Sequence, residues 1–153
     1  MLVNCEEVAM SRSAVEEIAA LGGELNANQY KIVHLAASYD AGLEWFDEGF
    51  QSSAFSIART LDIHTSTARE CVRVGYALRD LPLIDQAFGS NELSYAKTRI
   101  LTRWASPKNE HELLELAHSR SANRLTTAVA KYLAGGETDA ERDSRLHLSL
   151  IHI

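Results

Sequence analysis

The sequence predicts an all-α fold, built as a single multi-helix domain. Apolar residues recur every three or four positions along most of the chain, which is the spacing of one helix face. Glycines and the only two prolines, Pro82 and Pro107, lie between these periodic segments, and no sustained alternating run of β-branched residues predicts a sheet. With 153 residues, of which 46% are hydrophobic, the chain is long enough to bury a core without disulfides.

Two helices are predicted in the N-terminal third. The first covers residues 13–21, and the pair Gly22-Gly23 predicts its end. The second covers residues 28–41 and ends near Gly42. The apolar faces consist of Val15, Ile18 and Leu21 in the first helix, and of Ile32, Leu35, Ala36 and Tyr39 in the second.

Six further helices follow, and capping residues or prolines mark most of their boundaries. Two cover residues 53–61 and 65–79, and a short one begins at Pro82, a favoured first helical position, and closes at Gly89. The last three begin at Ser94, at Ser106-Pro107 and at Ser121, and both Ser94 and Ser121 are predicted caps. The helix after Ser94 runs to about residue 104, and the helix after Ser121 closes at Gly135-Gly136.

The helices over residues 53–61 and 65–79 match a helix-turn-helix unit. Such a unit needs a small residue where its helices touch, and Ala58 stands at that place. The turn has Asp62 where glycine is more common, but aspartate tolerates the left-handed conformation. Thr67 and Glu70 have the spacing of a capping box. The inner face is expected to hold Ile57, Leu61, Ile63, Ala68 and Cys71, and Val72, Leu78 and Leu101 are also expected to be buried.

In a DNA-binding unit, the outward side chains of the second helix face the groove. Here they are His64, Thr65, Ser66, Arg69, Glu70 and Arg73. A second basic set, in a stretch without acids, consists of Lys97, Arg99, Arg103 and Lys108. Residues four apart share a helix face, so the pairs Arg69/Arg73 and Arg99/Arg103 predict a cationic strip if both face one side. Two other interpretations remain open: a helical hairpin that never touches DNA, and arginines whose stems cover apolar surface.

The charge is distributed unevenly along the chain. The net charge of −6 opposes a nucleic-acid partner, because a phosphate-binding surface must supply positive charge. Residues 1–50, however, hold nine acidic and two basic residues, whereas residues 51–136 hold eleven basic and eight acidic ones. An acidic front and a basic middle are compatible with two separate surfaces, and equally with an ordinary solvated exterior.

The central sequence resembles a known family. The run SSAFSIARTLDIHTSTARECVRVGYALRDLPLIDQAFGSNELSYAKTRILTRWASPKNEHELLELA is similar to the actinobacterial helical domain of unknown function 222. Its most specific pieces are TARECVRV at 67–74, ALRDLP at 77–82, ELSYAK at 92–97 and ELLELA at 112–117. The resemblance covers about residues 25–133, and the chain differs from it at His64, where family members often have a serine cap before proline.

The resemblance implies that the parent polypeptide continues into an HNH endonuclease domain, which would be a partner of this one. The family has no established catalytic residues within the helical domain, so none is assigned here. An HNH site itself needs paired histidines and an asparagine, often with zinc-binding cysteines. The six histidines are scattered instead, and His111 and His118 are two turns apart rather than four residues apart. No catalytic residue, metal or cofactor is therefore predicted.

Four segments are expected along the chain. They are an N-terminal helical extension at 1–24, the helical domain at 25–136, an acidic linker at 137–147, and a tail at 148–153. The tail, LSLIHI, resembles a translated sequencing adaptor, which would mean that the reading frame is cut before the nuclease domain; a genuine short strand is the alternative. Two cysteines without a C-x-x-C pair, together with no apparent signal peptide or membrane span, predict a cytoplasmic protein.

Two hypotheses for function follow from the sequence. The first is a non-catalytic N-terminal domain of an HNH endonuclease that positions DNA through the helix-turn-helix and the neighbouring basic helices. The second is a protein-interaction or self-association module whose apolar groove takes a partner helix, with Trp45 and Phe46 as anchors. An independent enzyme has no supporting group of residues. Salt dependence separates the first two, because phosphate contacts weaken with salt.

Overall fold

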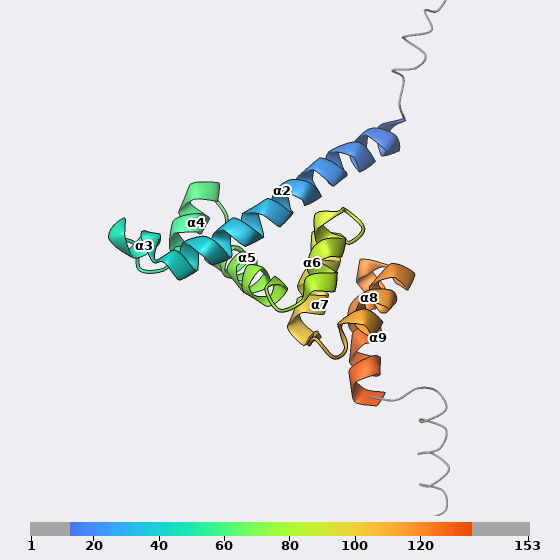
Figure 1. The fold of residues 1–153 in the computed structure, drawn as a ribbon. Coiled ribbons are helices and arrows are strands. Elements are labelled where there is room, and N and C mark those ends of the chain that lie inside the picture. Colours follow the sequence, from blue (N-terminus) through green and yellow to red (C-terminus); the bar gives the residue numbers. More distant parts are fainter. Residues whose placement is uncertain (1–12, 136–153) are drawn as a thin grey trace, which may run out of the picture.

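The protein folds into helices, as the sequence predicts. The computed structural model describes residues 13–135, and this part of the chain contains eight helices and no strand (Figure 1). They are α2 (Ala14–Gly42), α3 (Glu44–Asp47), α4 (Ser53–Leu61), α5 (Thr65–Leu78), α6 (Pro82–Gly89), α7 (Tyr95–Trp104), α8 (Glu110–Ser119) and α9 (Ala122–Gly135). The predicted linker and tail lie outside the described residues. Within those residues, no helix combines the length and the apolar character that crossing a membrane requires.

Helix α2 is a single helix of 29 residues, so the predicted break at Gly22-Gly23 is wrong. Ser13 caps its start by accepting a hydrogen bond from the amide of Glu16 at 3.2 Å, and Leu43, in the left-handed conformation, ends it. Glycine within a helix costs only about 1 kcal/mol relative to alanine, so packing of the C-terminal half can carry the helix through both glycines. The predicted boundary between residues 24 and 25 therefore falls inside one helix.

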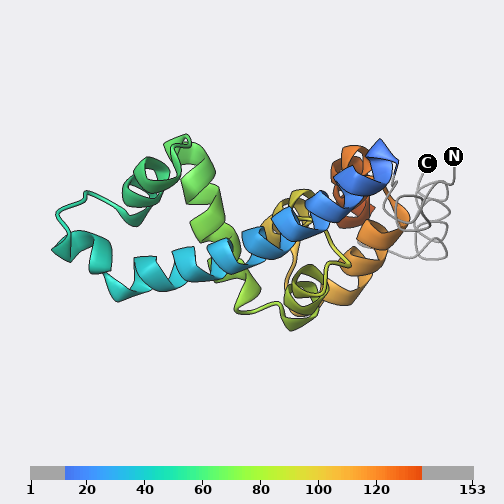
Figure 2. The same cartoon turned by 90° about the horizontal axis from the view of Figure 1, so that it is seen from above.

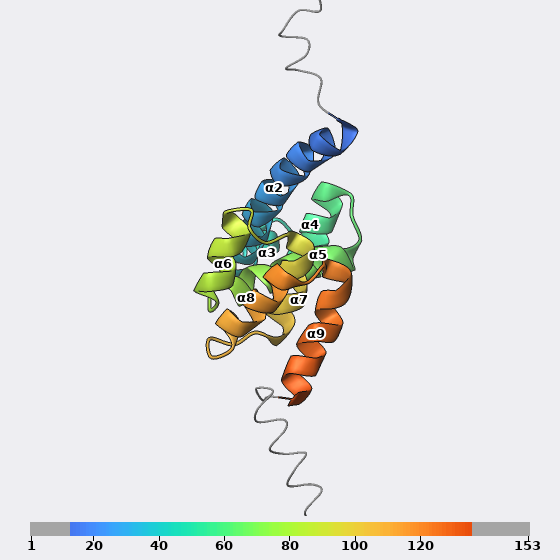
Figure 3. The same ribbon diagram turned by 90° about the vertical axis from the view of Figure 1, so that its right-hand side faces the viewer.

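The C-terminal half of α2 packs against α5. Val33 and Ala37 are fully buried there, and α5 contributes Gly75 to the contact. A Cβ on Gly75 would collide with the carbonyl oxygen of Val33 and lie 2.8 Å from the Cβ of Ala37. The two backbones therefore approach each other closely because this position has no side chain. The first turns of α2 extend away from the other helices, as the blue end of the ribbon shows (Figures 1 and 3).

The main core joins α2 and α5 to the C-terminal helices. Its largest fully buried side chains are Phe88, Ile84, Leu93, Leu101, Leu113 and Leu125. Fully burying one such side chain contributes roughly 1.5–3 kcal/mol. Leu78 and Leu101 are buried, as predicted. The core thus fixes α5 and α7 side by side, an arrangement on which the candidate site depends.

Helices α4 and α5 meet through small residues, as expected. Ala54, Ala58 and Ala68 form a separate buried cluster, and Asp62 in the turn has the left-handed conformation with φ 53°. The predicted inner face is wrong at Leu61, which is 44% exposed because, in the last turn of α4, it lines the open groove between α2 and α4. Ile57, Ile63 and Val72 are half-buried. The expected capping box is also wrong: His64 is the N-cap of α5 and has no side-chain capping bond, and Glu70 binds arginines instead.

The C-terminal helices follow their predicted boundaries except at α8. Pro82 opens α6, Ser94 caps α7 by accepting a hydrogen bond from the amide of Lys97 at 3.2 Å, and α9 begins directly after Ser121. Residues 106–109 form a turn rather than the predicted first turn of α8. The Asn109 side chain closes this turn by accepting a hydrogen bond from the Ser106 amide at 2.7 Å. Such local side-chain bonds compete with helix formation.

Candidate functional site

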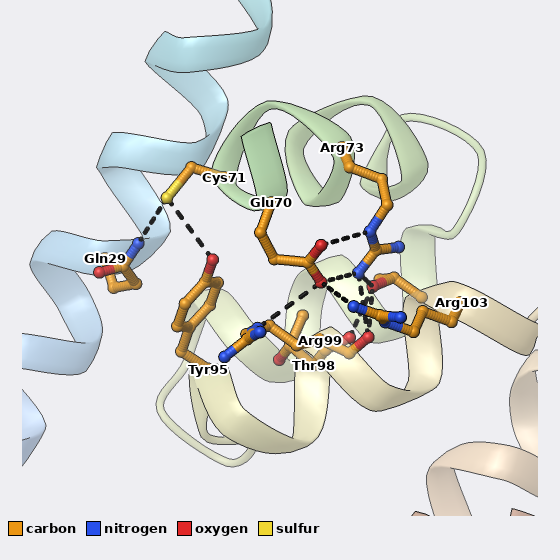
Figure 4. Close-up of polar contacts among 9 residues, drawn as sticks. Gln29, Glu70, Cys71, Arg73, Tyr95, Thr98, Arg99 and Arg103 are labelled. Carbon is orange, nitrogen blue, oxygen red and sulfur yellow. Dashed lines mark hydrogen bonds and ion pairs between the residues drawn. The ribbon is translucent and has the colours of Figure 1, made fainter. Parts of the chain in front are cut away.

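Three arginines surround one carboxylate between α5 and α7. Arg73 binds Glu70 through two hydrogen bonds, Nη2 to Oε1 at 2.5 Å and Nε to Oε2 at 3.0 Å. From α7, Arg103 Nη2 lies 3.2 Å and Arg99 Nε 3.5 Å from the same Oε1 (Figure 4). We call Glu70, Arg73, Arg99 and Arg103 the arginine cluster. It requires α5 and α7 to pack together, because the residues on α7 come 26 or more positions after those on α5.

Within the cluster, Arg73 has a structural role. Besides Glu70, its Nη2 donates hydrogen bonds to the carbonyl oxygen of Arg99 at 3.1 Å and to Oγ1 of Thr102 at 3.3 Å. These bonds join α5 to α7 and engage the guanidinium. Arg73 is also the least exposed of the three arginines, with 33% of its side chain exposed. Arg73, which was predicted to face a DNA groove, is therefore engaged in contacts within the protein.

The cluster carries excess positive charge. One carboxylate faces three guanidinium groups, which leaves a formal charge of +2. The hydrogen bonds from Arg73, followed by the charges of Arg73 and Arg103, lower the pKa of Glu70 from 4.5 to about 2. Glu70 is therefore ionised at neutral pH. Its side chain is only 12% exposed, whereas those of Arg99 and Arg103 are 47% and 54% exposed, so the positive groups face water and the negative group does not.

Cys71 and Tyr95 lie beside the cluster, facing α2. The thiol of Cys71 is 3.5 Å from the hydroxyl of Tyr95 and accepts a hydrogen bond from the side chain of Gln29 at the same distance (Figure 4). Burial, together with the neighbouring thiol, raises the pKa of Tyr95, and the guanidinium of Arg99 lies over the Tyr95 ring at 5.8 Å. Tyr95 is therefore protonated at neutral pH, and its ring lies under the guanidinium of Arg99.

Lys97, another predicted DNA contact, lies on α7 against the end of α8. It is half-buried, and its Nζ donates a hydrogen bond to the carbonyl oxygen of Ala117 in the last turn of α8 at 2.6 Å. A cation at this place compensates the negative end of the helix dipole. The spacing along α7 does not reveal that the end of α8 lies beside Lys97, so only the structure shows this contact.

The remaining predicted DNA-contacting residues lie at the start of α5. His64, Ser66 and Arg69 are exposed, and Thr65 is half-buried. Arg69 is one turn before Arg73 and shares its side of the helix, but among residues 13–135 no ion pair includes Arg69. The structure thus brings together Arg73, Arg99 and Arg103 from the predicted set and leaves Arg69 apart from them.

The sequence interpretation placed Glu70 on the outward face of its helix and in a capping box, but did not predict that it is the counter-charge of three arginines. Its i, i+3 spacing to Arg73 predicts a pair on one helix face. A second signal was the stretch 94–108, whose four basic residues have no acidic neighbour in the sequence and need a counter-charge from another element. The choice of Glu70 as that counter-charge required the packing of α5 on α7.

A second feature is an apolar groove between α2 and α4. It has a volume of about 520 Å³, and its apolar lining includes Ile32, Leu35, Ala36, Ile57 and Leu61. We call this the α2–α4 groove. The proposed anchors Trp45 and Phe46 are not among the residues that line it: Trp45 is half-buried and donates a hydrogen bond from Nε1 to the carbonyl oxygen of Asp40 at 3.2 Å, and Phe46 is 69% exposed.

In residues 13–135, no three His, Cys, Asp or Glu side chains come together in a group that could hold a metal ion.

Comparison with known proteins identifies no relative. No family model matches the chain, and neither a curated protein nor a solved structure matches it. The resemblance to the domain of unknown function 222 therefore stays a prediction that rests on the four quoted motifs.

Proposed function

We propose that this chain is a non-catalytic helical domain that holds a nucleic-acid backbone against its arginine cluster. The observation that carries the proposal is the +2 charge of the cluster, with Arg99 and Arg103 about half exposed and one helical turn apart on α7. In keeping with the sequence resemblance, its parent would be an HNH endonuclease, and this domain would position DNA for the nuclease domain.

The chemistry of the cluster favours phosphate over bases. A guanidinium presents parallel donors that match phosphate oxygens, and contacts to the backbone carry no sequence information. Arg73 is engaged by Glu70 and Thr102, so we do not propose that it reads base edges. Binding through Arg99 and Arg103 should therefore be independent of DNA sequence and should weaken strongly with salt.

The acidic part of the chain need not oppose this contact. Glu44, Asp47 and Glu48 lie at or directly after α3, at the end of the molecule remote from α7 (Figures 1 and 2). Exposed charges separated by more than about 10 Å are largely screened at physiological salt. These three acidic residues therefore lie apart from the arginine cluster in space.

Fluorescence anisotropy with a labelled DNA duplex of random sequence tests the proposal. Replacing both Arg99 and Arg103 by glutamine should reduce the slope of log affinity against log salt by about 1.8, because each phosphate contact contributes about 0.9. Arg79→Gln is the control, since this exposed arginine on the C-cap of α5 lies outside the cluster. Binding that is absent at low salt, or an equal loss in the double variant and the control, would refute the proposal. The chain should not cleave the duplex with magnesium, manganese or zinc.

A further inference from the structure

The outward face of α2 carries an apolar stripe along most of its length. Steps of three and four residues alternate through Ile18, Leu21, Leu25, Asn28, Ile32, Leu35 and Tyr39, which we call the α2 seam. This is the a/d pattern of a coiled coil. Four of its apolar residues are far from buried: Leu21, Ile18, Leu35 and Leu25 are 59%, 67%, 68% and 71% exposed, whereas Ile32 and Tyr39 are half-buried.

The opposite face of α2 contacts the rest of the protein. Asn26, Tyr30, Val33 and Ala37 repeat with the same steps of four and three, and Val33 and Ala37 are buried. Asn26 accepts a hydrogen bond from the amide of Tyr95 at 2.8 Å and donates one to the carbonyl oxygen of Leu93. The seam therefore points away from α5 and α7, and near its C-terminal end Tyr39 contacts Ser56 of α4. An exposed apolar stripe of this kind marks an interaction surface.

The seam has two different halves. The N-terminal half holds Ile18, Leu21 and Leu25 and runs toward the end of α2 whose first turns extend beyond the other helices (Figures 1 and 3). The C-terminal half, with Ile32 and Leu35, forms one wall of the α2–α4 groove, whose other wall is α4. A projecting apolar helix and an apolar groove on the same stripe are complementary shapes.

We propose that a second copy of this chain docks on the α2 seam, with the two α2 helices antiparallel. In the register that we propose, Ile18 of each copy lies opposite Leu35 of the other, Leu21 opposite Ile32, and Leu25 opposite Asn28. The projecting half of each α2 then occupies the α2–α4 groove of the other copy. The arrangement is isologous, so each contact occurs twice and the pair closes as a dimer.

Charge complementarity selects this register. In it, Glu24 of each copy flanks the seam opposite Lys31 of the other, and Lys31 is the only lysine or arginine between Ala14 and Gly42. A shift by one heptad in one direction would pair Lys31 with Glu17 but place Glu24 opposite Glu24, and a shift in the other would place Lys31 opposite Lys31. A parallel pair would leave Glu24 opposite Gln29, without an ion pair, and each projecting half opposite another projecting half instead of a groove.

Analytical ultracentrifugation of the full chain over a range of concentrations tests the dimer. The wild type should shift from monomer to dimer with increasing concentration, whereas Leu25→Glu should stay monomeric, because its charge would lie inside the seam. Leu83→Glu on α6 is the matched control, since Leu83 is also exposed, at 43%, and lies outside the seam. Circular dichroism checks that each variant is folded. A wild type that is monomeric throughout, or equal loss of dimer in both variants, would overturn the proposal.

Charge reversal tests the register. Glu24→Lys and Lys31→Glu should each weaken the dimer by roughly tenfold, since each creates two like-charge pairs, and the double variant should restore it. Failure of the double variant to recover would exclude the antiparallel register. Salt separates this proposal from the nucleic-acid contact, on which it does not depend. The dimer rests mainly on apolar contacts, so salt should weaken it far less than it weakens DNA binding, and the substitutions at Arg99 and Arg103 should leave it unchanged.

Discussion

Replacing Glu70 by glutamine removes the one negative charge of the arginine cluster while keeping a side chain of similar size. Arg73, Arg99 and Arg103 would then face one another without a counter-charge. We expect lower stability at neutral pH, because the ion pairs that hold α5 against α7 are lost and the three guanidinium groups repel each other. We also expect tighter DNA binding, because the formal charge of the cluster rises from +2 to +3.

The size of the stability change follows from the pKa of Glu70. A pKa lowered from 4.5 to about 2 corresponds to about 3 kcal/mol at most. Because Arg99 and Arg103 are half exposed, screening reduces this to about 1–2 kcal/mol. The carboxylate stabilises the folded state, so its contribution is fully present above pH 4.5 and is lost as the pH falls from 4.5 towards 2.

Urea denaturation followed by circular dichroism at pH 7, 4.5 and 3 measures this contribution. The free energies of unfolding of wild type and Glu70→Gln should differ by about 1–2 kcal/mol at pH 7 and converge towards pH 3. Glu92→Gln, at an exposed position without an ion pair in residues 13–135, should show no such dependence. Equal stability of Glu70→Gln and wild type at pH 7, or a difference that does not change with pH, would refute the reasoning.

Two further predictions concern packing. Gly75→Ala should destabilise the protein by about 3 kcal/mol, because its Cβ would collide with the backbone of Val33, whereas Gly22→Ala, with open space around it, should stabilise it by up to about 1 kcal/mol. Equal effects in thermal unfolding would contradict this. Glu110 is buried and accepts a hydrogen bond from the amide of Ile84 at 2.8 Å in the first turn of α6. Glu110→Ala should therefore cost about 1–3 kcal/mol in chemical denaturation, and Glu110→Gln, which keeps an acceptor, clearly less; similar losses would show that the bond is unimportant.

Local signals predicted most helix ends correctly. Pro82 and Ser94 mark the starts of α6 and α7, and Asp62 adopts the left-handed conformation that the turn requires. These features depend on interactions within one turn of the chain, so neighbouring residues suffice to specify them. The predictions failed where a local signal competed with another interaction: α2 continues through Gly22-Gly23, and Asn109 closes a turn where the first turn of α8 was expected.

The sequence by itself determined the all-α fold and the presence of basic residues on α5 and α7, because helical periodicity and side-chain charge are properties of short segments. Only the tertiary structure decided what those residues contact. Glu70 meets Arg103 from 33 positions away, and Lys97 meets the end of α8, because packing of the buried core brings those helices together. Packing also decided which side of α2 stays free. The apolar pattern alone gives two candidate faces, and the contact of Val33 and Ala37 with α5 leaves the α2 seam exposed.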